Sequence, residues 1–128
     1  MSERIVGVFA SRQDVVAVYQ FGSSVRGEAR PDSDVDVAVL FEASHRATLD
    51  APRFVIEGEL ERVLGRPVDL VALNDAPVDL RIRVLRHGRL LLDRVPQARI
   101  AFEVRTRNEA FDLEPVLARY RAPWSPRE

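Results

Sequence analysis

The sequence contains no cysteine and no lysine; all 19 of its basic residues are arginine. Without cysteine there is no disulfide framework, no thiolate zinc site and no cysteine nucleophile. Without lysine there is neither a lysine nucleophile nor the lysine of a Walker A phosphate-binding loop. Whatever chemistry the chain performs therefore depends on carboxylates, hydroxyls, histidine or arginine.

Long apolar runs and a surplus of one charge are absent as well. The first residues, MSERIVGVFASRQ, lack the apolar core of a signal peptide. No apolar run approaches the roughly 20 residues that cross a bilayer. The net charge of -1 gives no general basic field for nucleic acid. We expect a cytoplasmic protein that contacts no membrane and does not bind nucleic acid directly.

The 128 residues, 46% hydrophobic and 30% charged, fit a single domain over 1–128. Apolar spacing and turn residues predict helices over 2–11, 24–29, 49–64, 78–86 and 98–120, the last interrupted near Pro115. Strands are predicted over 14–21, 34–41, 67–73 and 89–93. The tail at 121–128 reads as loose. This alternation favours an α/β or α+β fold, with a small mixed sheet flanked by helices.

Three aspartates are candidate metal ligands. Asp34 and Asp36 begin a predicted strand, and side chains two residues apart on a strand point to the same side. Such a pair repels itself unless it stays in water or binds a cation, and Mg²⁺ suits one or two carboxylates. Asp69, on the next predicted strand, is placed to supply a third. Alone, the pair could be a solvated strand start, and Asp69 a loop residue or a buried ion-pair partner.

A glycine-serine turn precedes these aspartates by about a dozen residues. Gly22 follows a predicted strand, where the lack of a side chain lets the backbone approach a ligand, and the Ser23 hydroxyl can bond a phosphate oxygen. The following helix start adds its N–H groups. Arg26 and Arg30 flank Gly27, and arginine binds phosphate as a fork. The alternatives are a tight turn with a serine cap and surface arginines without a ligand.

The remaining candidate residues are better explained by solvent exposure or packing than by a functional role. A basic helix is predicted to carry Arg81, Arg83, Arg86 and Arg89, and a solvated face explains it better than a nucleic-acid or acidic partner. His45 and His87 are isolated in sequence, and we assign neither as ligand or base. Tyr120 and Trp124 near the C-terminus are candidate partner contacts, with packing or a loose tail as the alternative.

Taken together, these motifs resemble a known family. The stretch from Gly22-Ser23 through Arg26-Gly27 to Ser33-Asp34-Val35-Asp36, with Asp69 later, resembles the DNA polymerase beta-like nucleotidyltransferase superfamily. Within it, the likeness is closest to minimal nucleotidyltransferase (MNT) proteins, the antitoxins of HEPN/MNT toxin–antitoxin pairs, whose pattern reads about GSxARGxxxxxSDxDL. Val25 replaces the alanine and Val37 the leucine. The segments VLRHGRLLLD (84–93) and FDLEPVLARY (111–120) are similar too, so the resemblance covers most of the chain.

The resemblance implies a nucleotidyltransferase fold and a metal-dependent protein adenylyltransferase. Asp34, Asp36 and Asp69 would be catalytic and would hold two Mg²⁺ ions, with Mn²⁺ as a substitute. Gly22, Ser23, Arg26 and Gly27 would bind ATP. The acceptor would be a tyrosine hydroxyl of a partner HEPN ribonuclease toxin, silenced by adenylylation.

Two other functions stay open at this point. The chain could neutralise a toxin by binding alone, with the motif as a remnant. It could also transfer nucleotides to a small molecule or to RNA ends, although the short chain and neutral charge argue against both.

Overall fold

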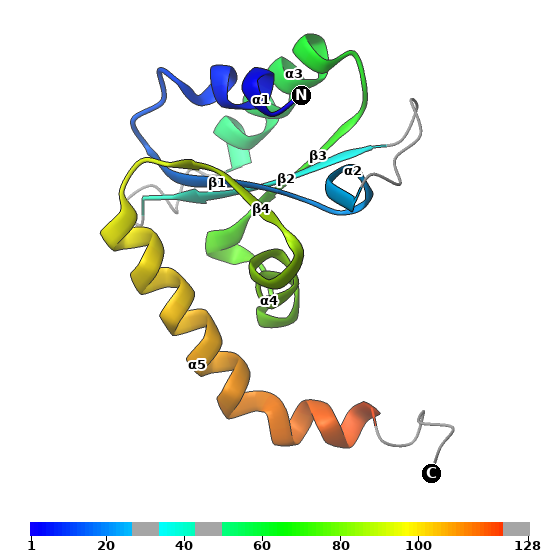
Figure 1. The fold of residues 1–128 in the computed structure, drawn as a ribbon, viewed down its shortest axis with the longest axis vertical. Coiled ribbons are helices and arrows are strands. Elements are labelled where there is room, and N and C mark those ends of the chain that lie inside the picture. The colour runs from blue at the N-terminus through cyan, green and yellow to red at the C-terminus, as the bar shows by residue number, and fades with distance from the viewer. Residues whose placement is uncertain (27–33, 43–49, 122–128) are drawn as a thin grey trace.

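A four-stranded mixed sheet forms the centre of the protein (Figure 1). The computed structural model describes residues 1–26, 34–42 and 50–121, except for the side chains of 26, 50–52 and 113–121. The strand order is β3-β2-β1-β4, with β1 antiparallel to both neighbours and β2 parallel to β3. The strands are β1 (Val15–Phe21), β2 (Val35–Phe41), β3 (Val68–Ala72) and β4 (Arg89–Asp93). The predicted strands and the mixed sheet are confirmed.

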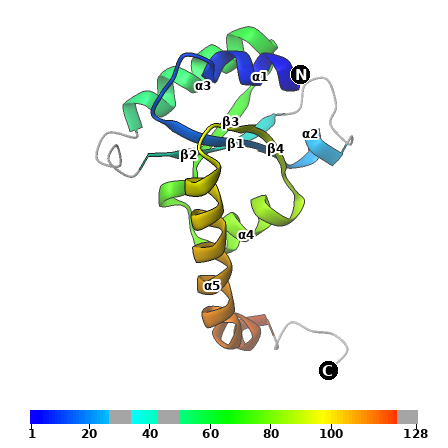
Figure 2. The same ribbon diagram turned by 60° about the vertical axis from the view of Figure 1, so that its left-hand side comes forward.

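Helices cover both faces of the sheet. Helices α1 (Ser2–Phe9) and α3 (Asp50–Leu64) pack on one face, while α4 (Val78–His87) and α5 (Pro96–Arg121) lie on the other (Figures 1 and 2). The short helix α2 (Ser23–Arg26) follows β1 at one end of the sheet. Its predicted extension to residue 29 lies outside the described residues. Among those that are described, no helix combines the length and the apolar character needed to cross a membrane.

Alternation along β2 divides the core into two layers. Val35, Val37 and Val39 are fully buried in the cluster under α1 and α3. Ala38 and Leu40 are buried in the second cluster, together with Val84 of α4 and others. Because side chains alternate across a strand, Asp36 lies on the side of the sheet that faces α4 and α5.

Carboxylates from α3 close the β3 edge of the sheet. Glu61 accepts a hydrogen bond from the Val68 N–H at 3.1 Å, and Glu57 accepts one from the Leu70 N–H at 3.0 Å. An edge strand otherwise exposes unpaired N–H groups that can pair with another chain. These two contacts fix β3, and with it Asp69, against the rest of the molecule.

The apolar residues at helical spacing in α3 differ in environment: Phe54 is 63% exposed, while Ile56 and Leu60 are fully buried. One prediction for the helices is wrong. The C-terminal helix begins at Pro96, where proline is tolerated in the first turn, and it runs without interruption past Pro115 to Arg121. Its axis turns in its last part (orange to red in Figure 1), as expected for an internal proline that bends a helix without ending it. Residues 122–128 of the predicted tail are outside the described part.

Candidate active site

Two of the three predicted aspartates lie side by side. Asp36 of β2 and Asp69 of β3 are direct partners in the parallel register, so both side chains lie on the same face of neighbouring strands. Asp36 is half-buried and Asp69 is exposed, which excludes the buried ion-pair interpretation of Asp69. Both line a cavity of about 500 Å³, together with Gly22 and Ser23. Residues separated by almost fifty positions thus share one small site.

Two features of the site require a glycine at position 22: the backbone conformation and the closeness of Asp36. Its φ angle of 80° lies in the left-handed region, where other residues are strained. A Cβ atom built there would collide with the Asp36 carboxylate. The glycine therefore brings the backbone of the turn against one of the two carboxylates.

Two serines in the turn have different roles. The Ser24 hydroxyl accepts a hydrogen bond from Gln20 Nε2 at 2.9 Å and lies 3.5 Å from the Phe21 carbonyl oxygen, so it fixes the turn. Ser23 lines the cavity, and within the described segments its hydroxyl makes no hydrogen bond. Of the two serines, Ser23 is therefore the one whose hydroxyl is available at the cavity.

The opposite wall of the cavity comes from α4, which sequence reasoning missed. Leu80, Arg83 and His87 line it, at the three- and four-residue spacing that places side chains on one face of a helix. We assigned no role to His87. Arg83 is exposed, as expected for a solvated helix face, but it also lines the cavity. The spacing of these residues was visible in the sequence, but nothing there indicated that this face of α4 lies opposite β2 and β3.

The structure does not bring the third predicted carboxylate into this cavity. Asp34 is exposed just before β2 and does not line the cavity. Across the described ranges, no three His, Cys, Asp or Glu side chains form a group ready to hold a metal ion. The Arg26 side chain, Gly27 and Arg30 lie outside the described residues. The site that the structure describes is thus the Gly22-Ser23 turn with Asp36 and Asp69.

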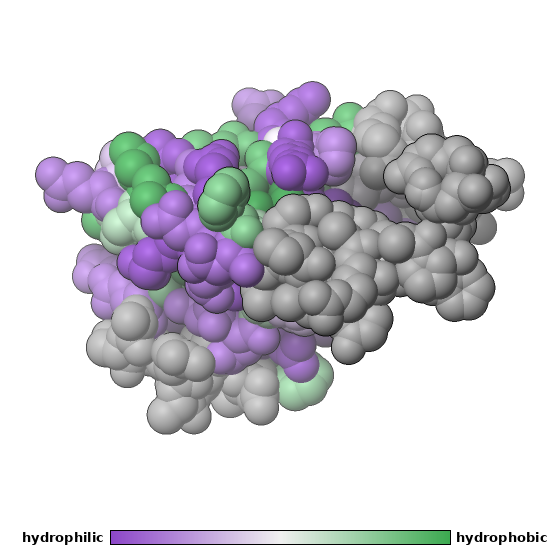
Figure 3. All heavy atoms as spheres, turned by 90° about the horizontal axis from the view of Figure 1, so that it is seen from below, coloured by the Kyte–Doolittle hydropathy of each residue, from purple (hydrophilic) through white to green (hydrophobic). Residues whose placement is uncertain are grey.

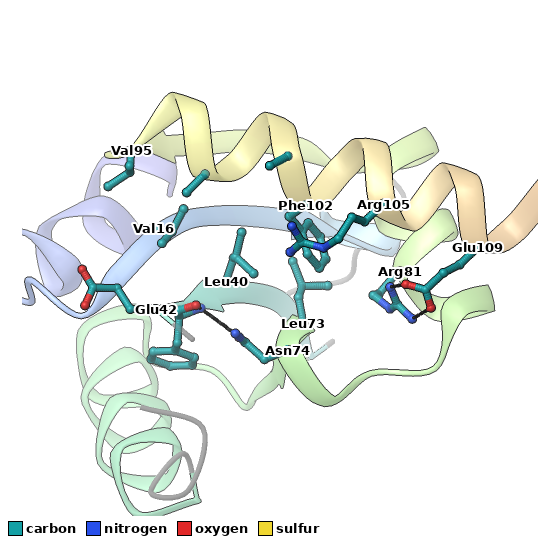
Figure 4. Close-up of a pocket in the computed structure, with 13 residues that line it drawn as sticks. Val16, Leu40, Glu42, Leu73, Asn74, Arg81, Val95, Phe102, Arg105 and Glu109 are labelled. Carbon is teal, nitrogen blue, oxygen red and sulfur yellow. Dashed lines mark hydrogen bonds and ion pairs between the residues drawn. The ribbon is translucent and has the colours of Figure 1, made fainter. Parts of the chain in front are cut away.

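A second cavity, of about 560 Å³, opens on the same face at the other end of the sheet (Figure 4). Two of its charged side chains, Arg81 and Glu109, bind each other. Arg81 forms a two-pronged ion pair with Glu109, at 3.1 Å for each bond, and donates to Thr106 at 3.1 Å. This contact lowers the pKa of Glu109. Arg81 is therefore not part of the solvated face that the sequence suggested: it fastens α4 to α5.

Asn74 closes the other side of this second cavity. It accepts from the Phe41 N–H at 2.9 Å and donates to the Phe41 carbonyl at 2.8 Å, which ties the turn Leu73–Asp75 to the end of β2 (Figure 4). Apolar side chains, including Val16, Leu40 and Phe102, line much of the rest. This cavity does not bring a carboxylate pair next to a glycine turn, so the first cavity is the candidate active site.

Comparison with known proteins identifies the family. Residues 3–97 match the family described as "Polymerase beta, Nucleotidyltransferase". The chain belongs to this family. The match includes β1, the Gly22-Ser23 turn, Asp36, Asp69 and the α4 residues that line the cavity. The whole candidate site therefore lies inside the nucleotidyltransferase domain.

One relative matches half of the chain in sequence, and two solved structures match most of the chain in fold. A protein adenylyltransferase, MntA, of Thermococcus cleftensis is 43% identical over 67 residues, 52% of this chain and 64% of that protein. The chain thus spans less than two thirds of the length of that relative. A crystal structure of a toxin–antitoxin with AMP-PNP matches at a TM-score of 0.75 and 27% identity, covering 95% of this chain and 93% of that one. The structure of a tri-AMPylated Shewanella oneidensis HEPN toxin in complex with MNT antitoxin matches at 0.68 and 25%, covering 95% and 90%.

The nucleotidyltransferase family generally uses divalent metal ions. Two carboxylates in register at a cavity fit that requirement, because Mg²⁺ prefers carboxylate oxygens and completes its shell with water and phosphate. Asp36 and Asp69 would hold such an ion. Asp34, on the same side of the strand as Asp36, is the nearest further carboxylate in the sequence.

Proposed function

We propose that this protein is an MNT-type antitoxin that transfers AMP from ATP to a tyrosine hydroxyl of a partner HEPN toxin and so silences it. The proposal is supported by the adenylyltransferase name of one relative and by the AMP-PNP and AMPylated-toxin descriptions of two structural neighbours. We place the pair in the cytoplasm, where ATP is available.

The reaction would be an in-line displacement at the α-phosphorus of ATP. The acceptor oxygen forms a bond to that phosphorus, the bond from the phosphorus to the α,β-bridging oxygen breaks, and pyrophosphate leaves with the electron pair. The hydroxyl proton passes to solvent. Because little covalent chemistry is required of the protein, positioning and charge stabilisation would supply most of the catalysis.

The residues of the cavity divide this work. Ser23 and the backbone at Gly22 would bind phosphate oxygens. Asp36 and Asp69, with Asp34, would hold two Mg²⁺ ions, for which Mn²⁺ could substitute. When bound, such ions neutralise phosphate charge and favour deprotonation of the acceptor hydroxyl.

One observation carries the proposal: Gly22 holds the turn so closely against Asp36 that no side chain fits between them. A backbone turn that can face phosphate and a carboxylate that can hold a cation are thereby fixed within one cavity, beside Asp69. A toxin-binding surface alone would not require this contact.

Intact-mass spectrometry tests the proposal. A HEPN toxin is incubated with this protein, ATP and Mg²⁺, and a gain of one or more AMP masses is expected. Asp36→Asn and Asp69→Asn should each remove the gain. Asp112→Asn, an exposed carboxylate on α5, is the matched control and should retain it.

A different result would assign a different function. If the toxin gains no mass but is still neutralised in a stable complex, also by the Asp36→Asn variant, the protein is an antitoxin that acts by binding. Transfer of AMP to a small molecule or to an RNA end, with none to the toxin, would indicate a different acceptor.

A further inference from the structure

The three arginines of α4 have three different environments. Arg81 is engaged with Glu109, Thr106 and the Ala76 carbonyl. Arg86 is exposed and lines neither cavity. Arg83 lines the candidate active site, and in the part of the chain that the structure describes its guanidinium has no hydrogen bond or ion pair. Arg83 and Arg86 are both exposed, but of these three arginines Arg83 alone lines the site and has a guanidinium without a partner among the described residues.

The position of Arg83 is set by the helix rather than by a partner side chain. Leu80 and His87 precede and follow it on the same face of α4 and line the same cavity. Gly88 ends the helix with its N–H bonded to the Val84 carbonyl at 2.8 Å. A Cβ at Gly88 would collide with that carbonyl oxygen and would lie 3.1 Å from the Gln20 carbonyl oxygen of β1. The helix is thus seated closely against the sheet, with Arg83 on the wall opposite the carboxylates.

The charges in the cavity are complementary to a metal-bound polyphosphate. Asp36 and Asp69 on the sheet side would repel a triphosphate unless cations intervene. A guanidinium on the opposite wall offers such a cation and presents two parallel N–H donors to phosphate oxygens. Because the α-phosphorus has to react near the carboxylates, a cation reaching in from α4 is placed for the β- and γ-phosphates.

We propose that Arg83 binds the β- and γ-phosphates of the nucleotide and so makes the site prefer ATP to AMP. This inference rests on the proposed function, since it assigns a role within the same site. It adds α4 to the nucleotide-binding elements and gives the leaving pyrophosphate a positively charged partner.

Equilibrium binding by calorimetry tests this role. ATP and AMP are titrated, each with Mg²⁺, into the wild type, Arg83→Gln and Arg86→Gln. Loss of a charge-assisted phosphate contact should weaken ATP binding by about tenfold to a hundredfold in Arg83→Gln. AMP binding should change less than about twofold, because AMP has no β- or γ-phosphate. Arg86→Gln, a neighbouring exposed arginine outside the cavity, should bind both nucleotides like the wild type.

Two other outcomes would overturn the proposed role of Arg83. Equal ATP affinity in the wild type and Arg83→Gln overturns the inference. Equal losses for ATP and AMP also overturn it, because they indicate a general change of the site; circular dichroism checks that the variant is folded. Arg83→Lys keeps the positive charge but lacks the two parallel N–H donors of the guanidinium. It should therefore bind ATP more tightly than Arg83→Gln and less tightly than the wild type.

These measurements separate the inference from the proposed function. A wild type that binds ATP but leaves the toxin unmodified overturns the proposed function and leaves the role of Arg83 standing. A wild type that binds no ATP in the presence of Mg²⁺ overturns both.

Discussion

At the scale of single residues, Gly22 combines a backbone constraint with a steric one. Gly22→Ala should cost roughly 1–2 kcal/mol for the left-handed backbone alone, at the φ of 80° that Gly22 adopts. In addition, the new Cβ should displace the Asp36 carboxylate. We therefore expect both a lower melting temperature and a loss of Mg²⁺-dependent ATP binding, measured by thermal unfolding and calorimetry.

Gly65 provides a matched control, because it shares the backbone constraint without the collision. Its φ is 67°, and a Cβ there would meet no atom within 4 Å. Gly65→Ala should lower the melting temperature by a similar backbone cost but leave ATP affinity unchanged. If Gly22→Ala binds ATP like Gly65→Ala, the close approach to Asp36 has no role in nucleotide binding.

At the scale of elements, a polar network fastens α5 to the sheet. The hydroxyl of the buried Tyr19 donates to Glu103 at 2.7 Å. Arg99 pairs with Asp93 at 2.9 Å and with Glu103 at 3.1 Å. Burial, and then the bond to the Glu103 carboxylate, raise the pKa of Tyr19. The network joins β1, β4 and α5 through a phenol that has to remain protonated.

The raised pKa makes the protein sensitive to alkali. A group with a raised folded-state pKa contributes its full stability below the unfolded pKa, here about 10, and the contribution is lost as pH rises above it. Urea unfolding of the wild type should therefore show falling stability above about pH 10. Because the chain has no lysine and only two tyrosines, few other groups titrate there.

Tyr19→Phe isolates this contribution. It should cost about 1–2 kcal/mol at pH 7 through the lost hydrogen bond, and its stability should fall less between pH 9 and 11. If both proteins lose stability in parallel over that range, Tyr19 is not the group responsible.

The sequence predicted elements better than it predicted their contacts. Alternation at Val35, Val37 and Val39 placed Asp36 on the correct face, because a strand has a fixed period of two. Helical spacing alone does not separate the exposed Phe54 from the buried Ile56 and Leu60, because which apolar residue is left outside depends on the partner surface. Arg81 and Arg83 are indistinguishable in sequence, but one meets Glu109 of α5 and the other faces the cavity. Such differences arise only when distant elements pack.

At the scale of the whole molecule, much of the surface is hydrophilic where α4 and α5 are viewed from below, with smaller hydrophobic areas among it (Figure 3). The exposed apolar side chains of α5 include Ile100, Val104 and Phe111.

The folding stability of the molecule and its ligand site are coupled through the carboxylates of the sheet. Like charges that face each other across strands destabilise a sheet, and Asp36 and Asp69 are such a pair.

This coupling predicts opposite effects of one substitution on the free and the ligand-bound protein. Asp69→Asn should raise the melting temperature of the free protein, because it removes repulsion at an exposed position. The wild type should gain about 2.7 kcal/mol when Mg²⁺-ATP is present at a hundred times its dissociation constant, since a ligand bound only to the native state stabilises it. Asp69→Asn should lose most of that gain, and excess chelator should abolish the gain in the wild type.

The control Asp112→Asn should change neither the melting temperature of the free protein nor its stabilisation by Mg²⁺-ATP. A variant at Asp69 that is no more stable when free, and is stabilised by Mg²⁺-ATP like the wild type, would show that the pair is a solvated strand feature and not a cation site.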